Sequence, residues 1–328
     1  MVKHRIGIVG VGKLGNYHCK ALSSIPEVDL VGLFDIDKQR CDEMARLYHC
    51  RAFDRYEDML AEVDAVGVIV PTIYHLDMAK MALMADKSVF VEKPIAGSIA
   101  EAQEMVDLAD KKALVLQVGH IERFNPAIRA LGSDLDPRFI ESHRLAPFDP
   151  RGTDVAVVLD LMIHDIDIIL SLVKSDPVRI DANGVAVVSS EIDIANARLL
   201  FRNGCVANVT ASRISQRKMR KMRLFQRDSY ISIDFLQKFS EVFRIVQNDH
   251  GAQNTLILGQ IDRGEVKRNI IYEKPRIPEE DAMQAEWMSF VDSMIHGTPP
   301  MVSGRDGLKA LEVATEITQK IADQKPLE

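Results

Sequence analysis

Two sets of polar residues have the types and spacing needed to oxidise an alcohol. Asp160 and His164 are four residues apart, so they share one face of a helix, and a carboxylate beside an imidazole strengthens it as a base. Histidine titrates near neutral pH, which suits a general base that removes a hydroxyl proton. Lys93 follows a short apolar run, where a lysine could polarise a carbonyl or hydroxyl oxygen. Taken alone, a polar helix face and a solvated lysine are commoner explanations of these residues.

A glycine-rich turn near the N-terminus predicts a dinucleotide site. Gly10, Gly12 and Gly15 form a GxGxxG pattern that encloses Lys13 and Leu14 and lies between an apolar run and a helical pattern. Gly10 permits the tight turn, Gly12 lets the backbone approach a pyrophosphate, and Gly15 lets the helix pack on the sheet. The first amides of the helix then face the phosphates. This context, rather than the glycines alone, indicates a cofactor site.

Asp35 indicates which nicotinamide cofactor binds. It ends the second predicted strand, 20 residues after Gly15. A carboxylate here accepts hydrogen bonds from both ribose hydroxyls and repels a 2′-phosphate, so the sequence predicts NAD rather than NADP. Lys38 and Arg40 lie nearby and could weaken that repulsion. For the neighbouring Asp37 we expect helix capping.

The elements that must position these residues fall into two domains of an α/β fold. From residue 1 to 122, apolar runs alternate with amphipathic helical patterns, which predicts a dinucleotide-binding Rossmann domain with a parallel sheet. The expected strands are Arg5–Val9, Leu30–Phe34, Ala65–Val70, Ser88–Val91 and Leu114–Val118. The expected helices are Leu14–Ser24, Lys38–Tyr48, Tyr56–Ala61, Ile73–Met84 and Ser98–Lys112, the last with a capping box formed by Ser98 and Glu101. Lys93 then lies at the carboxyl end of a strand, where open α/β sheets bind ligands.

Residues 123–328 predict a substrate-binding and oligomerisation domain of α+β type. A long helical segment, Ala156–Val173, precedes consecutive strand-like runs, which together favour a large, mostly antiparallel open sheet with helices on one face. The expected strands are Val178–Val188, Asp193–Phe201, Val206–Ser212, Met219–Phe225, Tyr230–Asp234 and Glu241–Val246. Two closing helices, Asp281–His296 and Arg305–Asp323, are expected in the same domain, and residues 248–274 show no clear pattern.

Composition and charge exclude several classes of partner. A net charge of −7 and an aromatic content of only 6% disfavour binding to nucleic acid or to an anionic membrane. No apolar run approaches the roughly 20 residues that span a bilayer. The basic run Arg213–Arg227 is therefore expected to form strands with a solvated or subunit-facing basic face. Four cysteines without a CxxC pair predict neither a disulfide framework nor a metal site, and they favour the cytoplasm.

Several of these motifs together resemble the Gfo/Idh/MocA family of sugar and polyol dehydrogenases. They are Gly10–Gly15, Asp35, Val70-Pro71-Thr72 with His75, Glu92-Lys93-Pro94 and Asp160–Asp165, in the family's order along nearly the whole chain. The resemblance implies that Lys93 contacts the nicotinamide ribose and the reacting hydroxyl, and that His164 is the general base. It implies that Asp160 binds the substrate or orients His164. It also implies that the nicotinamide half of the cofactor cleft is lined by Pro71, Thr72, His75 and Glu92.

A narrower resemblance concerns the substrate. Gly119–Pro126 and His143–Asp154 are similar to segments of bacterial UDP-N-acetylglucosamine 3-dehydrogenases, although His120 stands where the wider family has an aromatic or small residue. This resemblance implies oxidation of C3 to a 3-keto sugar nucleotide, which a partner aminotransferase uses in amino-sugar synthesis for lipid A. Guanidinium groups match the geometry of a diphosphate. Substrate contacts are accordingly expected from Arg123, Asn125, Arg144 and Arg151.

Two other functions stay open at this stage. The chain could oxidise a free sugar, inositol or another polyol, with the arginines serving only the structure. It could also be a catalytically silent NAD-binding regulator, although the retention of Lys93, Asp160 and His164 argues against this role. In each case we expect a homodimer or homotetramer, because in this family the open face of the second-domain sheet commonly forms the oligomer contact.

Overall fold

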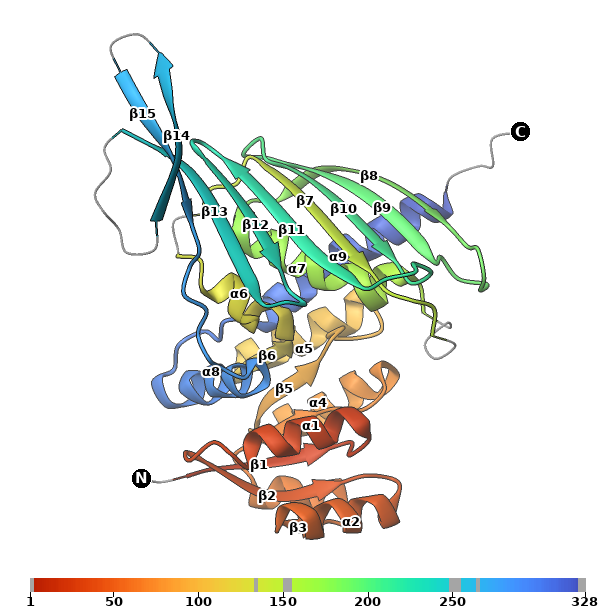
Figure 1. The fold of residues 1–328 in the computed structure, drawn as a ribbon. Coiled ribbons are helices and arrows are strands. Elements are labelled where there is room, and N and C mark those ends of the chain that lie inside the picture. The colour runs from red at the N-terminus through yellow and green to blue at the C-terminus, as the bar shows by residue number, and fades with distance from the viewer. Residues whose placement is uncertain (1–2, 133–134, 150–154, 248–254, 264–265, 324–328) are drawn as a thin grey trace. The chain divides into compact units, whose positions relative to one another are not determined.

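The computed structural model describes residues 3–132, 135–149, 155–247, 255–263 and 266–323 (Figure 1). The chain forms two compact units. The first contains Met1–Phe124 and Glu280–Glu312, and the second contains Asn125–Glu279 and Val313–Glu328. Each unit has its own sheet and its own set of buried apolar residues. Among the described ranges, no helix is both long enough and apolar enough to span a membrane.

The first unit is built on a parallel sheet. Its strands are β1 His4–Val9, β2 Val28–Phe34, β3 Arg51–Ala52, β4 Ala65–Val68, β5 Ser88–Glu92 and β6 Leu116–Gly119. They lie in the order β3-β2-β1-β4-β5-β6, and each neighbouring pair is parallel. All residues of β4 and β5 are buried, as expected of strands covered on both faces. This order confirms the predicted Rossmann fold, in which ligands bind beyond the carboxyl ends of the strands.

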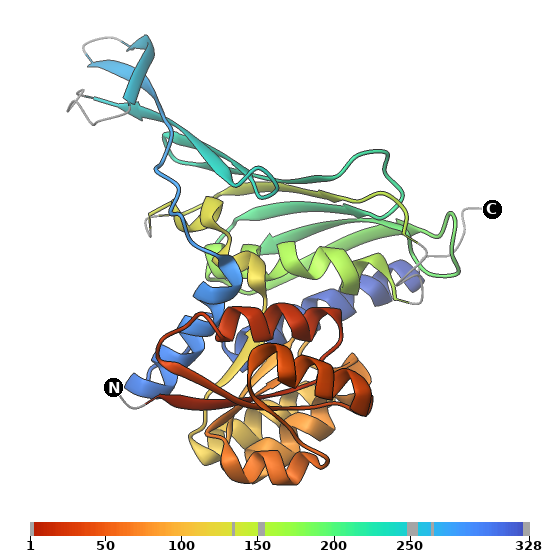
Figure 2. The same ribbon diagram turned by 60° about the horizontal axis from the view of Figure 1, so that its bottom comes forward.

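Helices pack on both faces of this sheet (Figure 2). They are α1 Lys13–Leu22, α2 Lys38–Tyr48, α3 Tyr56–Glu62, α4 His75–Met84 and α5 Ile99–Lys112, with the 3-10 turns η1 Thr72–Tyr74 and η2 Ile121–Phe124. α5 begins at the predicted capping box, in which the Ser98 hydroxyl accepts from the Glu101 amide and the Glu101 carboxylate accepts from the Ser98 amide. The sequence does not predict β3, because a strand of two residues leaves no periodic pattern.

The chain returns to the first unit through helix α8, Ala282–His296. Trp287 and Phe290 of this helix are fully buried beside Phe90 of β5, and the Trp287 and Phe90 ring centroids are 4.4 Å apart. The side-chain amide of Gln117 donates to the Glu286 carbonyl oxygen at 2.8 Å. From the sequence, this helix is predicted within the domain of residues 123–328, because packing between distant segments leaves no local signal.

The second unit is built on a nine-stranded sheet. Its strands are β7 Phe139–Leu145, β8 Pro177–Val185, β9 Ile194–Phe201, β10 Val206–Ser212, β11 Met219–Gln226, β12 Ser229–Asp234, β13 Phe239–Val246, β14 Thr255–Arg263 and β15 Val266–Glu273. Their order is β14-β15-β13-β12-β11-β7-β10-β9-β8, and the described pairs are antiparallel except β7 with β10. The predicted open, mostly antiparallel sheet is confirmed.

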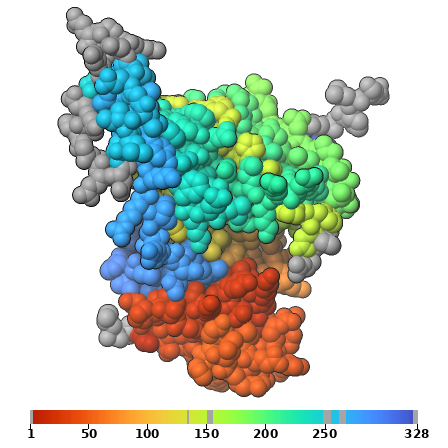
Figure 3. Space-filling view, in the orientation of Figure 1, coloured from red at the N-terminus to blue at the C-terminus, as the bar shows by residue number. Residues whose placement is uncertain are grey.

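Among the described residues, the helices of this unit lie along one face of the second sheet. The helical elements are α6 Pro126–Arg129, the π-helix η3 Val158–Met162, α7 Ile163–Val173 and α9 Gly304–Ala322, whose last residues belong to this unit. Figures 1 and 2 show α7 and α9 along one face, and Figure 3 shows the other face of β9 to β13 without a covering helix. Every second residue of β9 is buried, the pattern of a strand with one covered face.

β7 lies inside the sheet, yet the sequence does not predict it. Its buried residues are Ile140, Ser142 and Arg144, so only one of the three is apolar. The alternation of apolar residues that predicts a strand is therefore missing. The polar pair is tolerated because both side chains bond to Asp165 of α7. β14 and β15 lie in the segment 248–274, where the sequence shows no clear pattern.

Candidate active site

The glycine loop fits the phosphates of a dinucleotide. Gly10 has a φ of +91°, and a Cβ on it would clash with the Ile69 carbonyl oxygen, so only glycine fits there. A Cβ on Gly15 would clash with the Gly10 carbonyl oxygen, which explains why α1 can approach the loop so closely. Around Gly12, by contrast, a Cβ would meet nothing within 4 Å. A side chain at Gly12 would fill this open space at the N-terminus of α1, where backbone amides favour an anion.

Lys13 and Leu14 form the first exposed residues of α1. Gly12 is the N-cap of this helix and supplies no side-chain cap, and no acidic residue lies in the first turn. The amides of this turn are therefore not opposed by a carboxylate of the helix itself, which favours a bound phosphate.

Asp35 is half-buried at the end of β2, directly beside the glycine loop. Its Oδ2 accepts from the Val11 amide at 2.7 Å, and its Oδ1 accepts from the Asp37 amide at 2.9 Å. A carboxylate has about four acceptor positions, so both oxygens can accept from ribose hydroxyls as well. The two amide bonds hold the carboxylate in place for that contact.

The residues after Asp35 serve the helix α2. Asp37 caps it by accepting from the Arg40 amide at 3.1 Å, which confirms the predicted cap. The Arg40 guanidinium lies 3.1 Å from the Asp37 carboxylate, and the Lys38 ammonium lies 2.6 Å from that of Asp54. Lys38 and Arg40 thus each have a carboxylate partner other than Asp35. They are therefore less available to offset the repulsion between Asp35 and a 2′-phosphate.

The loop after β4 contains Pro71, Thr72 and His75. Pro71 is exposed and Thr72, which begins η1, is half-buried. His75 is only 1% exposed, and its ring nitrogens each lie 2.9 Å from a carbonyl oxygen, Nδ1 from that of Pro94 and Nε2 from that of Val70. Burial lowers the pKa of His75 below its usual range, although the two carbonyl contacts oppose this. His75 therefore links the segments after β4 and β5, and the cofactor contact expected of it stays a prediction.

Glu92 and Lys93 lie at the carboxyl end of β5, and the Lys93–Pro94 peptide bond is cis. Lys93 is half-buried, and its backbone amide donates to Glu92 Oε2 at 3.1 Å. Glu92 Oε1 lies 2.9 Å from Nε2 of His18, a fully buried residue of α1. A Cβ on Gly119 would lie 2.8 Å from Glu92 Oε1, so glycine is needed there. The motifs of the sequence do not include His18. A polar residue on the buried face of α1 is nevertheless a pattern that could have indicated it.

His120 is a buried histidine that lies near several charged residues of the first unit. Its pKa is lowered to about 3, mainly by burial and also by the positive charges of Lys93 and Arg123, while Glu92 and Asp306 oppose this shift. The imidazole is therefore neutral at physiological pH. Arg123 donates from Nη2 to the Met301 carbonyl oxygen at 2.9 Å. The structure thus brings Lys93, Glu92 and Arg123 together around a neutral histidine.

In the second unit, Asp160 and His164 lie on one continuous helical segment. The sequence predicts a single helix over this segment, whereas residues 158–162 form the π-helix η3 and α7 begins at Ile163. Asp160 belongs to the π-helix and His164 to the first turn of α7, and both are half-buried. Four residues make about one turn of either helix type, so both residues lie on the same side of the segment. π-helical turns occur frequently at functional sites.

A buried ion pair holds the start of α7 against the sheet. Arg144 of β7 donates from Nε to Asp165 at 2.6 Å, and both side chains are 2% exposed. Ser142 donates to the same carboxylate at 2.9 Å. Asp165 directly follows His164, so this pair fixes the helix turn that carries the histidine. Arg144 thus has a structural role, because its guanidinium is buried against Asp165, and the substrate contact expected of it stays a prediction.

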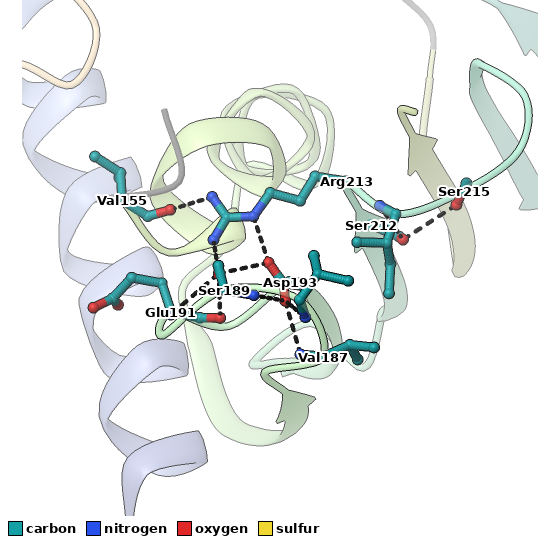
Figure 4. Close-up of polar contacts among 10 residues, drawn as sticks. Val155, Val187, Ser189, Glu191, Asp193, Ser212, Arg213 and Ser215 are labelled. Atoms are coloured by element: carbon teal, nitrogen blue, oxygen red, sulfur yellow. Dashed lines mark hydrogen bonds and ion pairs between the residues drawn. The ribbon is translucent and has the colours of Figure 1, made fainter. Parts of the chain in front are cut away.

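A second buried ion pair holds the chain just before η3 (Figure 4). Arg213 donates from Nε to Asp193 at 2.8 Å and from Nη1 to the Val155 carbonyl oxygen at 2.6 Å. Asp193 also accepts from the amides of Val187, Val188 and Ser189. Burial alone would raise the pKa of Asp193, but these amides and Arg213 outweigh burial and lower it well below its usual range. Arg213, the first residue of the basic run, is thus a structural residue.

Two basic residues of β11, Lys221 and Arg223, lie on the open face of the sheet and have acidic partners. Lys221 lies 3.4 Å from Asp234, and Arg223 lies 3.4 Å from Glu141. This neutralised arrangement agrees with the expected solvated or subunit-facing strand.

The other two predicted substrate contacts have different outcomes. Asn125 is 7% exposed, its Nδ2 donates to the Phe235 carbonyl oxygen at 3.1 Å and its Oδ1 caps α6 by accepting from Ala127. These bonds give Asn125 a structural role, and the substrate contact expected of it stays a prediction. Arg151 lies outside the described residues. Among the residues that are described, no cluster of three or more potential metal ligands occurs.

Comparison with known proteins identifies relatives along almost the full length of the chain. A family model described as an oxidoreductase family with an NAD-binding Rossmann fold matches residues 4–120, and a model of the GFO/IDH/MocA C-terminal domain matches residues 136–230. The UDP-N-acetylglucosamine 3-dehydrogenase of Acidithiobacillus ferrooxidans is 36% identical over 97% of each chain. A solved structure of that enzyme has a TM-score of 0.86 over 98% of each chain, at 34% identity. The myo-inositol 2-dehydrogenase of Thermotoga maritima is 27% identical over 94% of this chain and 93% of its own.

The matched segments contain the residues described above. The first family model spans the glycine loop, Asp35 and Lys93, and the second spans Asp160 and His164. The match to the A. ferrooxidans enzyme covers nearly all of both chains, so it includes both units. By fold, glycine loop and full-length similarity, the chain belongs to the Gfo/Idh/MocA family of oxidoreductases, whose N-terminal domain binds NAD through a Rossmann fold.

Proposed function

We propose that this protein oxidises the C3 hydroxyl of UDP-N-acetylglucosamine to the 3-keto sugar nucleotide, with NAD as the oxidant. The observation that carries the proposal is the 36% identity to the A. ferrooxidans UDP-N-acetylglucosamine 3-dehydrogenase over 97% of both chains. The inositol dehydrogenase from T. maritima is less similar, at 27%. The glycine loop and Asp35, which fit a dinucleotide with a free 2′-hydroxyl, support the choice of NAD.

In this proposal each unit contributes a group with a distinct role. When bound, NAD supplies the acceptor for the hydride that leaves C3. His164 removes the proton of the C3 hydroxyl as general base, and the neighbouring Asp160 strengthens it or binds the sugar. The Lys93 ammonium stabilises the negative charge that develops on the oxygen. The two bonds to Glu92 and the buried ion pair beside His164 support this assignment, since they hold the reacting groups in fixed positions.

The substrate's diphosphate requires cationic partners. Of the two predicted arginines that the structure describes, Arg123 is partly exposed. Its Nη2 donates to the Met301 carbonyl oxygen, and it lies near Lys93 and His120. We propose that Arg123 and Arg151 bind the diphosphate. Neutral His120 fits this role for Arg123. A protonated imidazole would place another positive charge beside the guanidinium, which costs free energy.

The second candidate is oxidation of a free polyol. It is favoured by one observation, the 27% identity to T. maritima myo-inositol 2-dehydrogenase over 94% of this chain. In that case the arginines would serve only the structure, and removing Arg123 would not change the affinity for the substrate.

The experiment that separates the two candidates is a coupled assay. Purified protein is incubated with NAD and either UDP-N-acetylglucosamine or a panel of free polyols, and NADH absorbance is followed. Because oxidation of a sugar hydroxyl can be uphill, a 3-keto-sugar aminotransferase and an amino donor are added to remove the product, as the proposed partner enzyme would. Formation of an amino sugar nucleotide supports the proposal. Turnover of a polyol with no amino sugar nucleotide would establish the second candidate instead.

The open face of the second sheet supports assembly into a homodimer or homotetramer. Five aromatic side chains lie opposite one another across it, with neighbouring ring centroids 5.0–5.8 Å apart. They are Phe139, Phe225, Tyr230, Phe243 and Tyr272. Phe225 is exposed and the other four rings are half-buried, so they form an apolar strip that an identical strip on a second copy can cover about a two-fold axis. Tyr230→Glu should therefore lower the mass measured by light scattering, whereas Leu47→Glu on exposed α2 should not.

We also propose that the enzyme works in the cytoplasm. Its four cysteines are free thiols, as a reducing compartment requires, and Cys19, Cys41 and Cys205 are buried. Burial raises the pKa of Cys19 to about 12 and that of Cys205 to about 11, so these thiols stay protonated and unreactive.

A further inference from the structure

Behind Glu92 lies a chain of two hydrogen bonds that no motif of the family resemblance includes. The indole Nε1 of Trp287 donates to His18 Nδ1 at 3.0 Å, and His18 Nε2 lies 2.9 Å from Glu92 Oε1. Trp287 and His18 are fully buried, and Glu92 is 9% exposed. The three residues come from α8, α1 and β5, which are far apart in the sequence but belong to the same unit. We call them the Trp287–His18–Glu92 chain.

Trp287 determines which nitrogen of His18 carries the proton. An indole N–H can only donate, so His18 Nδ1 must be the acceptor and carries no proton. In the neutral imidazole the proton is then on Nε2, which donates to Glu92 Oε1. Both hydrogen bonds therefore run in one direction, from Trp287 through His18 to the Glu92 carboxylate.

The surrounding rings prevent this chain from reorienting. The Phe90 ring stacks on Trp287 at 4.4 Å between centroids and meets the edge of His18 at 5.4 Å. Phe290 packs against Trp287 at 5.6 Å in a T-shaped arrangement. Phe90 and Glu92 are two residues apart on β5, so their side chains lie on the same face of the strand. The aromatic cluster thus determines the direction from which Glu92 receives its hydrogen bond.

We propose that His18 is a positioning residue for the hydride-transfer reaction, held in its Nε2–H tautomer by Trp287 and acting through Glu92. Glu92 Oε1 accepts from His18, and Oε2 accepts from the Lys93 amide at 3.1 Å. Fixing the Glu92 carboxylate therefore fixes the backbone of Lys93, which the proposed function places at the reacting hydroxyl. No proton is transferred along the chain, and the inference rests on that proposed function for its effect on catalysis.

The first test measures the tautomer and needs no enzymatic activity. Protein labelled with ¹⁵N-histidine is examined by long-range ¹H–¹⁵N correlation spectroscopy, and the His18 signals are assigned by their loss in His18→Gln. We expect the wild type to show a protonated Nε2 and an unprotonated Nδ1. In Trp287→Phe, which removes the donor but keeps a ring, the pattern should shift towards protonated Nδ1. Phe290→Leu disturbs the same ring cluster without touching either hydrogen bond, so it should retain the wild-type pattern.

The second test separates positioning from folding. His18→Leu removes the donor to Glu92, whereas His18→Gln keeps an N–H at a similar distance along the side chain. We expect His18→Leu to lower kcat about tenfold or more, as for loss of a hydrogen bond to a charged group, while the Kd of NAD changes by less than about threefold. His18→Gln should recover most of the lost kcat. Circular dichroism and thermal melting identify any variant that fails to fold, and Trp287→Phe then replaces His18→Leu in the comparison.

The outcomes distinguish this inference from the proposed function. An Nδ1–H tautomer in the wild type, or an unchanged pattern in Trp287→Phe, would overturn the inference whatever the substrate is. Wild-type kcat in a folded His18→Leu variant would also overturn it, because His18 would then be only a packing residue. Failure of the proposed function would appear differently, as wild-type protein that does not oxidise UDP-N-acetylglucosamine, whereas the tautomer of His18 is measured without any substrate.

Discussion

The two units hold their proposed reaction residues with different kinds of buried polar contact. In the first unit, neutral Trp287 and His18 lead by hydrogen bonds to the single carboxylate of Glu92. In the second unit, Arg144–Asp165 and Arg213–Asp193 are buried ion pairs whose side chains are at most 6% exposed. A chain of neutral donors fixes the direction of hydrogen bonds. An ion pair fixes position, but it leaves an uncompensated buried charge when one partner is removed. The second unit should therefore be the more sensitive of the two to loss of a single partner.

The largest effect is expected from Asp165→Ala. It leaves the Arg144 guanidinium buried without its carboxylate, so the free energy of unfolding should fall by about 3–5 kcal/mol. Urea unfolding followed by circular dichroism measures this. The matched control is Glu141→Ala, at a residue of β7, the strand that also carries Arg144. It breaks the more exposed pair with Arg223 of β11 and should cost less than about 1 kcal/mol. Equal losses in the two variants would contradict the contrast between buried and exposed pairs.

Lys93→Met and His164→Asn test whether each unit contributes to the reaction. Each should lower turnover by roughly 10²-fold or more, the usual effect of losing a general acid–base group, while the fold and NAD affinity stay largely intact. His164→Asn should in addition remove the acidic limb of the pH–rate profile. Steady-state kinetics in the coupled assay and NAD titration measure these effects. Near-normal turnover in one of these variants would show that the substituted residue is not the reacting group of its unit.

Asp35→Ser should affect only the first unit. It removes acceptors for the ribose hydroxyls and the charge that repels a 2′-phosphate, so NAD should bind about tenfold more weakly and the gap to NADP should narrow. The stability of the second unit should not change. Calorimetric titration with both dinucleotides measures the affinities, and tighter binding of NADP by the wild type would refute the assignment of Asp35.

The smallest effect is a change in the pH dependence of stability, apart from the loss of stability at neutral pH that removing the partner of buried Arg213 causes. Burial raises the pKa of Asp193, but the amides of Val188 and Val187, Arg213 and Ser189 lower it more, so its folded-state pKa lies below the unfolded value. At acid pH the unfolded chain then binds more protons, and the stabilisation present above about pH 4 is lost as the pH falls towards the folded-state pKa. Asp193→Asn should flatten the dependence of unfolding free energy on pH between about 4 and 2. An unchanged slope would show that Asp193 does not carry this linkage.

The sequence by itself determined the parts of the molecule that depend on local patterns. Alternating apolar runs and helical patterns gave the parallel sheet and its strands. Gly15 could be interpreted correctly because its contact with the Gly10 carbonyl oxygen lies within one strand–turn–helix unit, and Gly10 because its positive φ belongs to the turn itself. The Ser98 cap and the Asp37 cap were predictable for the same reason, since each bonds to an amide three residues away. Composition alone was enough to argue against nucleic acid and membrane partners.

Only the tertiary structure decided which polar residues are exposed and which are buried against a partner. Arg144 and Asn125 have side chains that could bind a sugar nucleotide, and their sequence neighbours do not reveal that Asp165 and the Phe235 carbonyl already occupy them. β7 was hidden for the same reason, because its buried face is polar and satisfied by another element. The role inferred for His18 depends on Trp287, 269 residues away. Such pairings arise from long-range packing, which leaves no periodicity in the chain, so burial and partner had to come from the folded structure.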